Sequence, residues 1–371
     1  MNARVTELAA HAAATAAVGE EPVALAALRM MLRWPGQVLD VLDGHVQAPP
    51  PEAPIDAAAA VPVYTPEAYL ALQPGLAHHH DADGFAAFTL RGGTALVVGG
   101  PQAPEACRQQ VLRGVVAATR QLGVRRQVLF PVRPAALDDV RQVGFAATQV
   151  GVEAWVDLHD FTLAGKRWAH LRQMRNRAEK RGVEVEETRP GPWDEAMERV
   201  WDAWVAAKHP RWSLRWLTGT PSLEQPLDRR YFVAQAAGRL QAFCTVLPGP
   251  DGTWAVDVLC RAPDAIPGSM ERLLVQAFEI LREEGARSVN LGPCPLAGRG
   301  DDGVEDGPSG LMGAAFRWAW RSSLAERLFG FRGLHAFKAK FRPRWEPVYL
   351  AAAPRLGWVE MYAAARLWAL G

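Results

Sequence analysis

Residues 165–187 gather positive charge in a stretch as long as one helix. Apolar residues recur there at helical spacing, which predicts one buried stripe: Trp168, Leu171, Met174 and Ala178. The outward side carries polar side chains at four-residue steps, with further cations beside them: Arg172, Asn176 and Lys180, then Lys166, Arg177 and Arg181. Such a surface would attract the phosphates of a nucleic acid, with an affinity that falls as salt rises. The alternative is a solvated face whose arginines pair with the acids that follow: Glu184, Glu186 and Glu187.

Asp257 places a carboxylate on a predicted central strand, between Val256 and Val258. Alternation along a strand directs it away from both valines, and a carboxylate in a sheet requires a partner or a function. It could accept a proton from an attacking hydroxyl, or it could hold the ammonium group of a substrate. The structural alternative is an ion pair with Arg261 at the end of the same strand. Asp257 and Arg261 are the first two candidate catalytic residues.

Asn290 is the third candidate catalytic residue. It lies in a predicted strand, residues 287–292, at an edge where open sheets commonly place ligands. Its amide could orient a substrate carbonyl, or it could satisfy the amides of the following turn.

Two pairs of residues are candidates for substrate binding. Lys338 and Lys340 carry ammonium groups two residues apart in FKAKF and could clamp a phosphate. Solvation of both side chains explains the same pattern. Gly268 and Ser269 open a predicted helix whose free amides could hold an anion, although a serine cap is the alternative.

The sequence predicts neither a metal site nor a disulfide. The imidazoles of His78, His79 and His80 are adjacent and therefore point in different directions. The cysteines lie far apart without paired spacing, which favours a reducing cytoplasm: Cys107, Cys244, Cys260 and Cys294.

The chain as a whole is almost neutral, with 41 Lys and Arg against 40 Asp and Glu in 371 residues. Attraction to an anion must therefore come from local patches. The first fifty residues mix acids with alanines, which predicts no export signal or membrane span there. We expect a cytoplasmic protein. Residues 21–34 mix Arg29 and Arg33 with apolar residues and could contact a membrane surface or pack on the protein.

The elements that must position these residues repeat along the chain. Residues 84–101 predict a hairpin that turns at Gly92-Gly93, and a helix and a buried strand follow it. The same order returns later as three strands, a helix and a strand: residues 231–238, 240–249, 253–263, 269–285 and 287–292. The sequence therefore predicts an internal duplication.

Seven motifs occur in an order that resembles a known family: ALVVGGP, WVDL, the basic helix, Asp257 and Arg261 as D-x-x-x-R, PGSM, NLGPCPLAG and GLHAFKAKFRPRWEPVYL. Together they resemble the C-terminal catalytic domain of bacterial lysyl-phosphatidylglycerol synthases and related aminoacyl-tRNA-dependent lipid aminoacyltransferases, over roughly residues 75 to 350. The synthases also carry an N-terminal membrane flippase region, and this sequence shows no such region.

The resemblance implies an α+β fold of tandem GNAT-like acyltransferase domains, similar also to the Fem peptidyltransferases, each with a mixed central sheet flanked by helices. It predicts four parts: residues 1–60 as a helical extension and linker, 61–160 as a first GNAT-like domain, 161–215 as a basic helical connector, and 216–371 as the catalytic domain. An aminoacyl group would pass from a tRNA 3′ end to a lipid hydroxyl at the inner membrane face. Aminoacyl-tRNA is then the co-substrate, and no other cofactor is expected.

The resemblance also assigns the outward cations to tRNA. Because the aminoacyl ester is already activated, transfer requires positioning and proton removal rather than a protein nucleophile. Two alternatives remain. One is an acyl-CoA-dependent GNAT N-acyltransferase, although a glycine-rich pyrophosphate signature is not evident. The other is a non-catalytic tRNA-binding protein.

Overall fold

The computed structural model describes residues 65, 68–73, 75–91, 93–207, 228–298, 310–323, 326, 330–357 and 360–361. Its strands are β1 (Ala77–Asp81), β2 (Gly84–Arg91), β3 (Thr94–Gln102), β4 (Arg126–Val132), β5 (Ala146–Asp157), β6 (Glu184–Thr188), β7 (Arg230–Ala236), β8 (Arg239–Pro248), β9 (Thr253–Arg261), β10 (Ser288–Pro295) and β11 (Arg344–Ala353). Its α-helices are α4 (Arg108–Gln121), α5 (Leu137–Gln142), α6 (Ala169–Glu179), α7 (Asp194–Ala207), α9 (Ser269–Glu283), α10 (Gly310–Arg321) and α12 (Phe331–Ala339).

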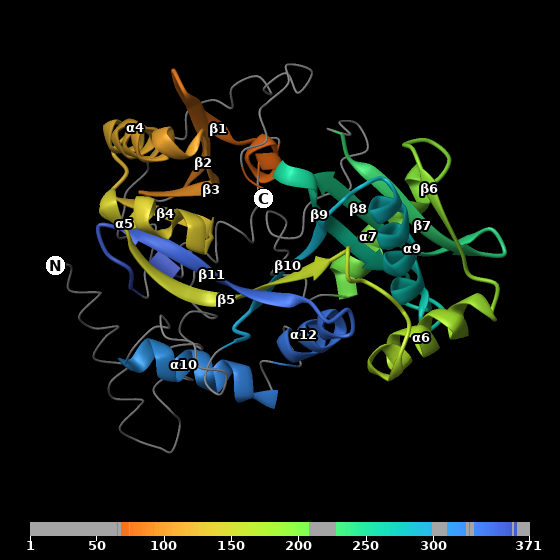
Figure 1. The fold of residues 1–371 in the computed structure, drawn as a ribbon. Helices are drawn as coiled ribbons and strands as arrows, with labels where there is room; N and C mark the ends of the chain where they lie inside the picture. The colour runs from red at the N-terminus through yellow and green to blue at the C-terminus, as the bar shows by residue number, and fades with distance from the viewer. Residues whose placement is uncertain are drawn as a thin grey trace.

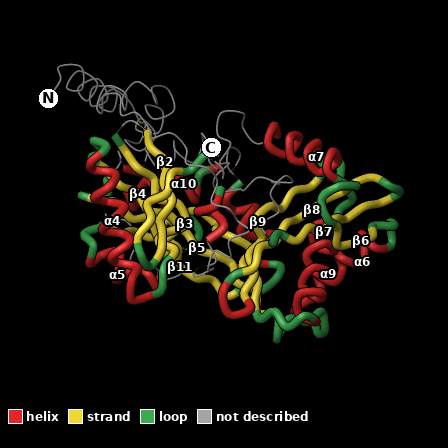
Figure 2. The backbone as a smooth tube through the Cα atoms, turned by 90° about the horizontal axis from the view of Figure 1, so that it is seen from above, coloured by secondary structure: helices red, strands yellow, loops and turns green. Residues whose placement is uncertain are grey.

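All eleven strands join in one mixed sheet, in the order β1-β2-β3-β4-β11-β5-β10-β9-β8-β7-β6 (Figure 1). Helices α4 and α5 lie with the strands of the first half, while α6 and α9 lie with those of the second (Figure 1). Helix α7 lies on the other side of the sheet from α9 (Figure 2). The α+β class, with a mixed sheet flanked by helices, is confirmed.

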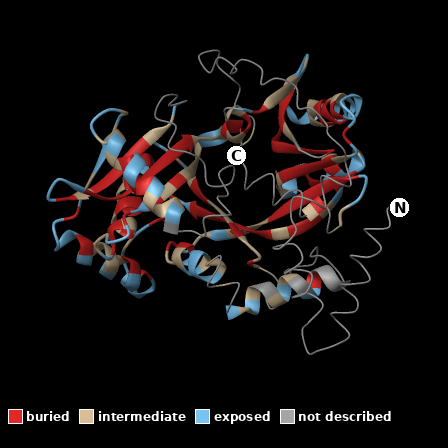
Figure 3. Ribbon diagram, turned by 180° about the vertical axis from the view of Figure 1, so that it is seen from behind, coloured by how far each residue is buried: buried red, intermediate tan, exposed pale blue. Residues whose placement is uncertain are grey.

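Both halves repeat one arrangement, as the sequence predicts. In the first half β2 and β3 are antiparallel, α4 follows, and β4 returns parallel to β3. In the second half β8 and β9 are antiparallel, α9 follows, and β10 returns parallel to β9. The apolar stripe of α9 covers the sheet because its leucines, Ala277 and Phe278 are buried, while Met270 is partly buried. Strands and inward helix faces form a continuous buried layer (Figure 3).

The two halves are joined by strands that are distant in sequence. Strand β11, near the C-terminal end, lies between β4 and β5 and is antiparallel to both. Strand β5 pairs with β10 on its other edge. The first half thus receives a strand from the end of the chain, and the sheet continues without a break. The domain boundaries at 60, 160 and 215 stay predictions.

Some predicted features lie outside the described residues. They are the N-terminal extension, residues 1–60, and its segment 21–34. In the part that the structure describes, no helix combines the length and hydropathy needed to cross a bilayer.

Candidate functional site

The candidate site lies where β9 and β10 cease to pair. Their parallel ladder covers only Thr253–Ala255 opposite Ser288–Asn290, although both strands continue. Asp257 lies just beyond this point on β9, and Gly292 lies just beyond it on β10. Helix α9 begins eight residues after β9 ends, so its N-terminal end follows this point closely in the chain.

Asp257 occupies a β-bulge. Thr245 of β8 pairs with Val258 and Val246 pairs with Val256, so Asp257 has no partner in the ladder. Val256 consequently packs in the cluster under α9, while Val258 packs in the cluster under α7. The predicted simple alternation around Asp257 is wrong, because the extra residue interrupts it.

The partner of Asp257 is Arg229, a residue that no sequence pattern singles out. The Nη2 atom of Arg229 lies 2.9 Å from Oδ2 of Asp257, and the two side chains are only 5% and 6% exposed. The hydroxyl of Thr245 donates to the same carboxylate oxygen at 3.4 Å and accepts a hydrogen bond from the amide of Val258. The alternative ion pair with Arg261 is wrong, since Arg261 is exposed at the end of β9.

Burial raises the pKa of Asp257, while the charge of Arg229 and the hydrogen bond from Thr245 lower it. Burial is the largest of these effects, and it disfavours the ionised carboxylate. A carboxyl group with a raised pKa is a stronger proton acceptor once it is ionised. This environment is the kind that enzymes use for general bases.

Asn290, on the neighbouring strand β10, joins a second polar group. Its Nδ2 donates to Oε2 of Glu153 on β5 at 3.2 Å, and Arg133, just after β4, lies 3.0 Å from the same oxygen. Its Oδ1 accepts from the amide of Gly292 at 2.8 Å, in the bulge that separates Asn290 from Pro293. The expected role in satisfying a turn amide is therefore confirmed.

Lys338 reaches the same bulge from α12. Its side chain is buried, and its Nζ donates to the carbonyl of Pro293 at 3.0 Å. Burial lowers its pKa, although Cys294 and Glu153 act in the opposite direction. The alternative that this lysine is solvated is wrong, because α12 packs against β10 and buries its side chain.

Lys340 faces a different element. Its Nζ lies 2.7 Å from Oε1 of Glu271, in the first turn of α9. The two lysines therefore diverge, one to β10 and one to α9, and the structure does not bring them together as a clamp. Lys338 lies in the last turn of α12, which ends at Ala339, and Lys340 follows as its C-cap.

Gly268 and Ser269 form the start of α9, but no side chain caps this helix. The hydroxyl of Ser269 donates instead to the carbonyl of Ile266 at 2.7 Å, so the capping alternative is wrong. Gly268 has φ +97°, and a Cβ there would lie 2.1 Å from the carbonyl oxygen of Met174 on α6. Glycine at this position thus allows α6 and α9 to approach closely.

The basic helix forms as predicted, with Trp168, Leu171 and Ala178 buried. Of its predicted outward line, Arg172 donates to the carbonyls of Leu163 and Gly165, and Asn176 accepts from Arg175. These two residues are therefore engaged. Five exposed lysines and arginines of residues 165–187 pair with no acid in the part of the chain described here: Lys166, Arg167, Arg177, Lys180 and Arg181. A depression of about 430 Å³ lies among Gln173, Asn176, Arg177, Lys180 and Arg181.

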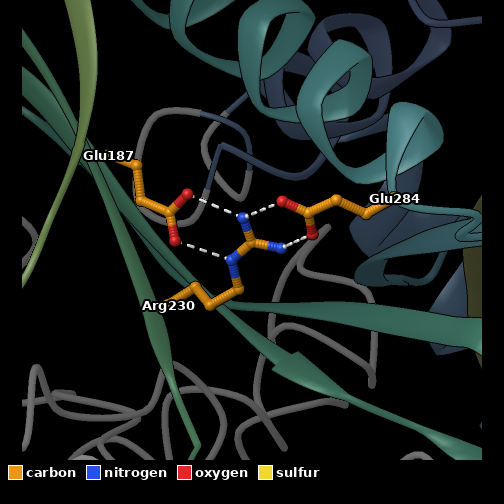
Figure 4. A network of polar contacts seen from close by, with 3 residues as sticks. All are labelled: Glu187, Arg230 and Glu284. Atoms are coloured by element: carbon orange, nitrogen blue, oxygen red, sulfur yellow. Dashed lines mark hydrogen bonds and ion pairs between the residues drawn. The ribbon is translucent and has the colours of Figure 1, made fainter.

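The glutamates after this helix do not neutralise it. Arg230 of β7 binds Glu187, with its Nε and Nη2 atoms 2.7 and 2.6 Å from the two carboxylate oxygens. The same guanidinium also binds Glu284 at the end of α9 (Figure 4). Glu184 accepts from Gln235, and Glu186 accepts from the indole of Trp193. The expectation that these acids neutralise the basic face is wrong, because strand β6 directs them toward β7 and α7.

The family model described as "Phosphatidylglycerol lysyltransferase, C-terminal" matches residues 60–352. The chain belongs to this family. The phosphatidylglycerol lysyltransferase of Bacillus subtilis (strain 168) is 31% identical over 221 residues, which cover 56% of this chain and 24% of that protein. The one from Staphylococcus xylosus is 23% identical over 298 residues, covering 77% and 33%.

Solved structures share the fold of this family member. A C-terminal DUF2156 domain from Agrobacterium fabrum, described as part of a lysylphosphatidylglycerol synthetase, has a TM-score of 0.67 at 26% identity and covers 81% of this chain and 90% of its own. The L-PGS structure from Bacillus licheniformis has the same TM-score at 22% identity and covers 82% and 90%. The chain spans a quarter to a third of the length of the two lysyltransferases above.

Proposed function

We propose that this protein transfers an aminoacyl group from an aminoacyl-tRNA to a hydroxyl of a phosphatidylglycerol-like lipid. Family membership and the names of its relatives support transfer of an amino acid to a lipid. The tRNA donor is supported by the exposed cations of the α6 surface, which suit an RNA backbone.

The observation that carries the proposal is the buried carboxylate of Asp257 beside the opening between β9 and β10. In the transfer, the lipid oxygen attacks the ester carbonyl and its proton passes to a base. The bond to the tRNA ribose oxygen then breaks, and the base returns the proton to that departing oxygen. Asp257 is that base. Arg229 already neutralises the carboxylate, so a substrate ammonium would find little net charge there. This favours proton transfer over the binding of an amine.

The polar group around Asn290 would then orient the donor. Its fixed hydrogen bonds with Glu153 and Gly292 hold the amide in one orientation, which is the condition for positioning a carbonyl. Both substrates place the reaction at the inner membrane surface, because charged tRNA is cytoplasmic and the acceptor is a lipid.

The deciding experiment supplies charged tRNA and lipid together. The full chain is incubated with phosphatidylglycerol vesicles and lysyl-tRNA, and in parallel reactions with other charged tRNAs. The lipids are then analysed by mass spectrometry. We expect an aminoacylated lipid that is lost when the tRNA is first treated with RNase. If acetyl-CoA supports acyl transfer and no charged tRNA does, the proposal is wrong.

A further inference from the structure

A second opening lies in the first half of the molecule. Strands β3 and β4 pair in parallel from Thr94 opposite Arg126 to Val98 opposite Phe130, and their pairing ends there. Strands β3 and β4 are the counterparts of β9 and β10 in the internal repeat, so this opening corresponds to the candidate site of the second half. A cavity of about 530 Å³ occupies it, between the end of β3, the start of α4, the segment after β4, and the central strands β5 and β11.

Two buried hydrogen-bond donors in the lining of the cavity have no acceptor among the described residues. The Nε of Arg108 is buried and has no hydrogen-bond partner among the described residues, and the same holds for the indole Nε1 of Trp155. Trp155 is only 5% exposed, so water does not readily replace the missing partner. Buried donors of this kind are normally satisfied, and two in one cavity indicate a ligand with acceptor oxygens.

Of the three arginines in the lining, only Arg108 forms no ion pair with a described residue. Arg133 pairs with Glu153, and Arg344 pairs with Glu346 on β11. Asp139 accepts from the neutral amide of Gln109 and forms no ion pair with a described residue. It would repel an anion, so the ligand phosphate must lie at the Arg108 and Arg133 side of the cavity.

The remaining wall is apolar. Leu112 and Leu129 are buried beneath it, Val140 closes it, and the guanidinium of Arg133 lies 4.7 Å above the Trp155 ring. A wall of this kind suits a ligand that carries hydrocarbon beside its anionic group. It is less suited to the ribose and bases of an RNA end.

We propose that this cavity binds the phosphodiester of the acceptor lipid, with its phosphate on Arg108 and Arg133. The inference rests on the proposed function. Guanidinium groups match phosphate oxygens in planar, two-pronged geometry. Glu153 connects the cavity to the transfer site, because it binds both Arg133 and Asn290. A lipid held here by its phosphate presents its headgroup hydroxyl toward the central strands.

The test measures binding without turnover. The full chain is titrated calorimetrically with short-chain phosphatidylglycerol below its micelle concentration, with glycerophosphoglycerol, and with inorganic phosphate. We expect the lipid to bind more tightly than its deacylated headgroup, and phosphate alone to bind most weakly. Arg108→Gln is expected to weaken both phosphodiesters at least tenfold. Arg113→Gln, an exposed arginine on the same helix, is the matched control and is expected to change neither affinity.

A second variant tests the same site independently, in case Arg108→Gln does not fold. Ala135 lines the cavity at an exposed position, so Ala135→Trp fills it without disturbing the core and is expected to abolish lipid binding. Wild-type lipid affinity in Arg108→Gln and Ala135→Trp would overturn the inference, as would displacement of the lipid by an uncharged tRNA acceptor-stem RNA. Equal affinity for the lipid and its headgroup would show a site for soluble phosphodiesters instead. Arg108-dependent binding without aminoacyl transfer would refute the proposed function alone.

Discussion

At the scale of single residues, the proposed transfer depends on one buried carboxylate, that of Asp257. Asp257 is unpaired in its ladder and held by Arg229 and Thr245, so its position is fixed by two neighbours. A bulge that re-aims one polar side chain is a recurrent device near active sites.

Asp257→Asn should reduce kcat by about 100-fold or more, because the amide cannot accept the proton. Lipid aminoacylation measured at saturating charged tRNA checks this. Asp264→Asn is the matched control, since Asp264 forms an exposed ion pair with Arg239 in the same half. We expect nearly unchanged turnover in the control, and wild-type kcat in Asp257→Asn would contradict the role of base.

The pH dependence of kcat/KM should report the same group. Burial raises the pKa of Asp257, and the base acts only when ionised, so activity should fall on acidification at a higher pH than an ordinary aspartate would give. Because the pKa of Asp257 is raised in the folded protein, ionisation of this carboxyl group opposes folding. Its contribution to the free energy of unfolding is present at low pH and is lost as pH rises through the folded pKa. An acid limb at or below the ordinary aspartate pKa would contradict this account.

At the scale of elements, the contact between α6 and α9 decides where the basic helix lies. Gly268 permits that contact by a backbone conformation that other residues rarely adopt, with the carbonyl of Met174 directly against it. Arg272 of α9 also pairs with Glu179 at the end of α6.

Gly268→Ala should lower the free energy of unfolding by about 2 to 4 kcal/mol, since it combines a positive φ with a steric overlap. Gly285→Ala is the control at the other end of α9. Gly285 has φ +91° but open space around its Cβ position, so about 1 kcal/mol is expected. Urea unfolding of both variants separates overlap from backbone strain, and equal losses would show that the helix contact contributes nothing.

At the scale of the whole molecule, the cations of the α6 surface stand out because the chain is otherwise balanced in charge. Arg177 and Lys180 are exposed and pair with no acid among the residues described, while the nearby glutamates are bound elsewhere.

Arg177→Gln combined with Lys180→Gln should weaken tRNA binding and reduce the slope of log Kd against log salt by about 2. Arg120→Gln combined with Arg125→Gln removes the same charge from an exposed part of the first half and should leave the slope unchanged. Fluorescence anisotropy over a salt series distinguishes the two pairs. Equal slopes in both would assign tRNA binding to another surface.

The sequence by itself determined the features that depend on local periodicity and ordered motifs. The apolar stripe of α9, the buried stripe of the basic helix and the repeated order of strands all follow from neighbours a few residues apart. The family followed from motifs in order, and Asp257 and Asn290 could be singled out because polar residues on central strands require a reason.

Only the tertiary structure decided which polar and charged side chains contact one another. Asn290 and Glu153 are 137 positions apart, and Lys340 and Glu271 are 69 apart, so no local pattern could pair them. The insertion of β11 between β4 and β5 likewise depends on which sheet edge is free once both halves have folded. Register and side-chain direction at a bulge depend on the neighbouring strand, which is why Arg229 rather than Arg261 holds Asp257.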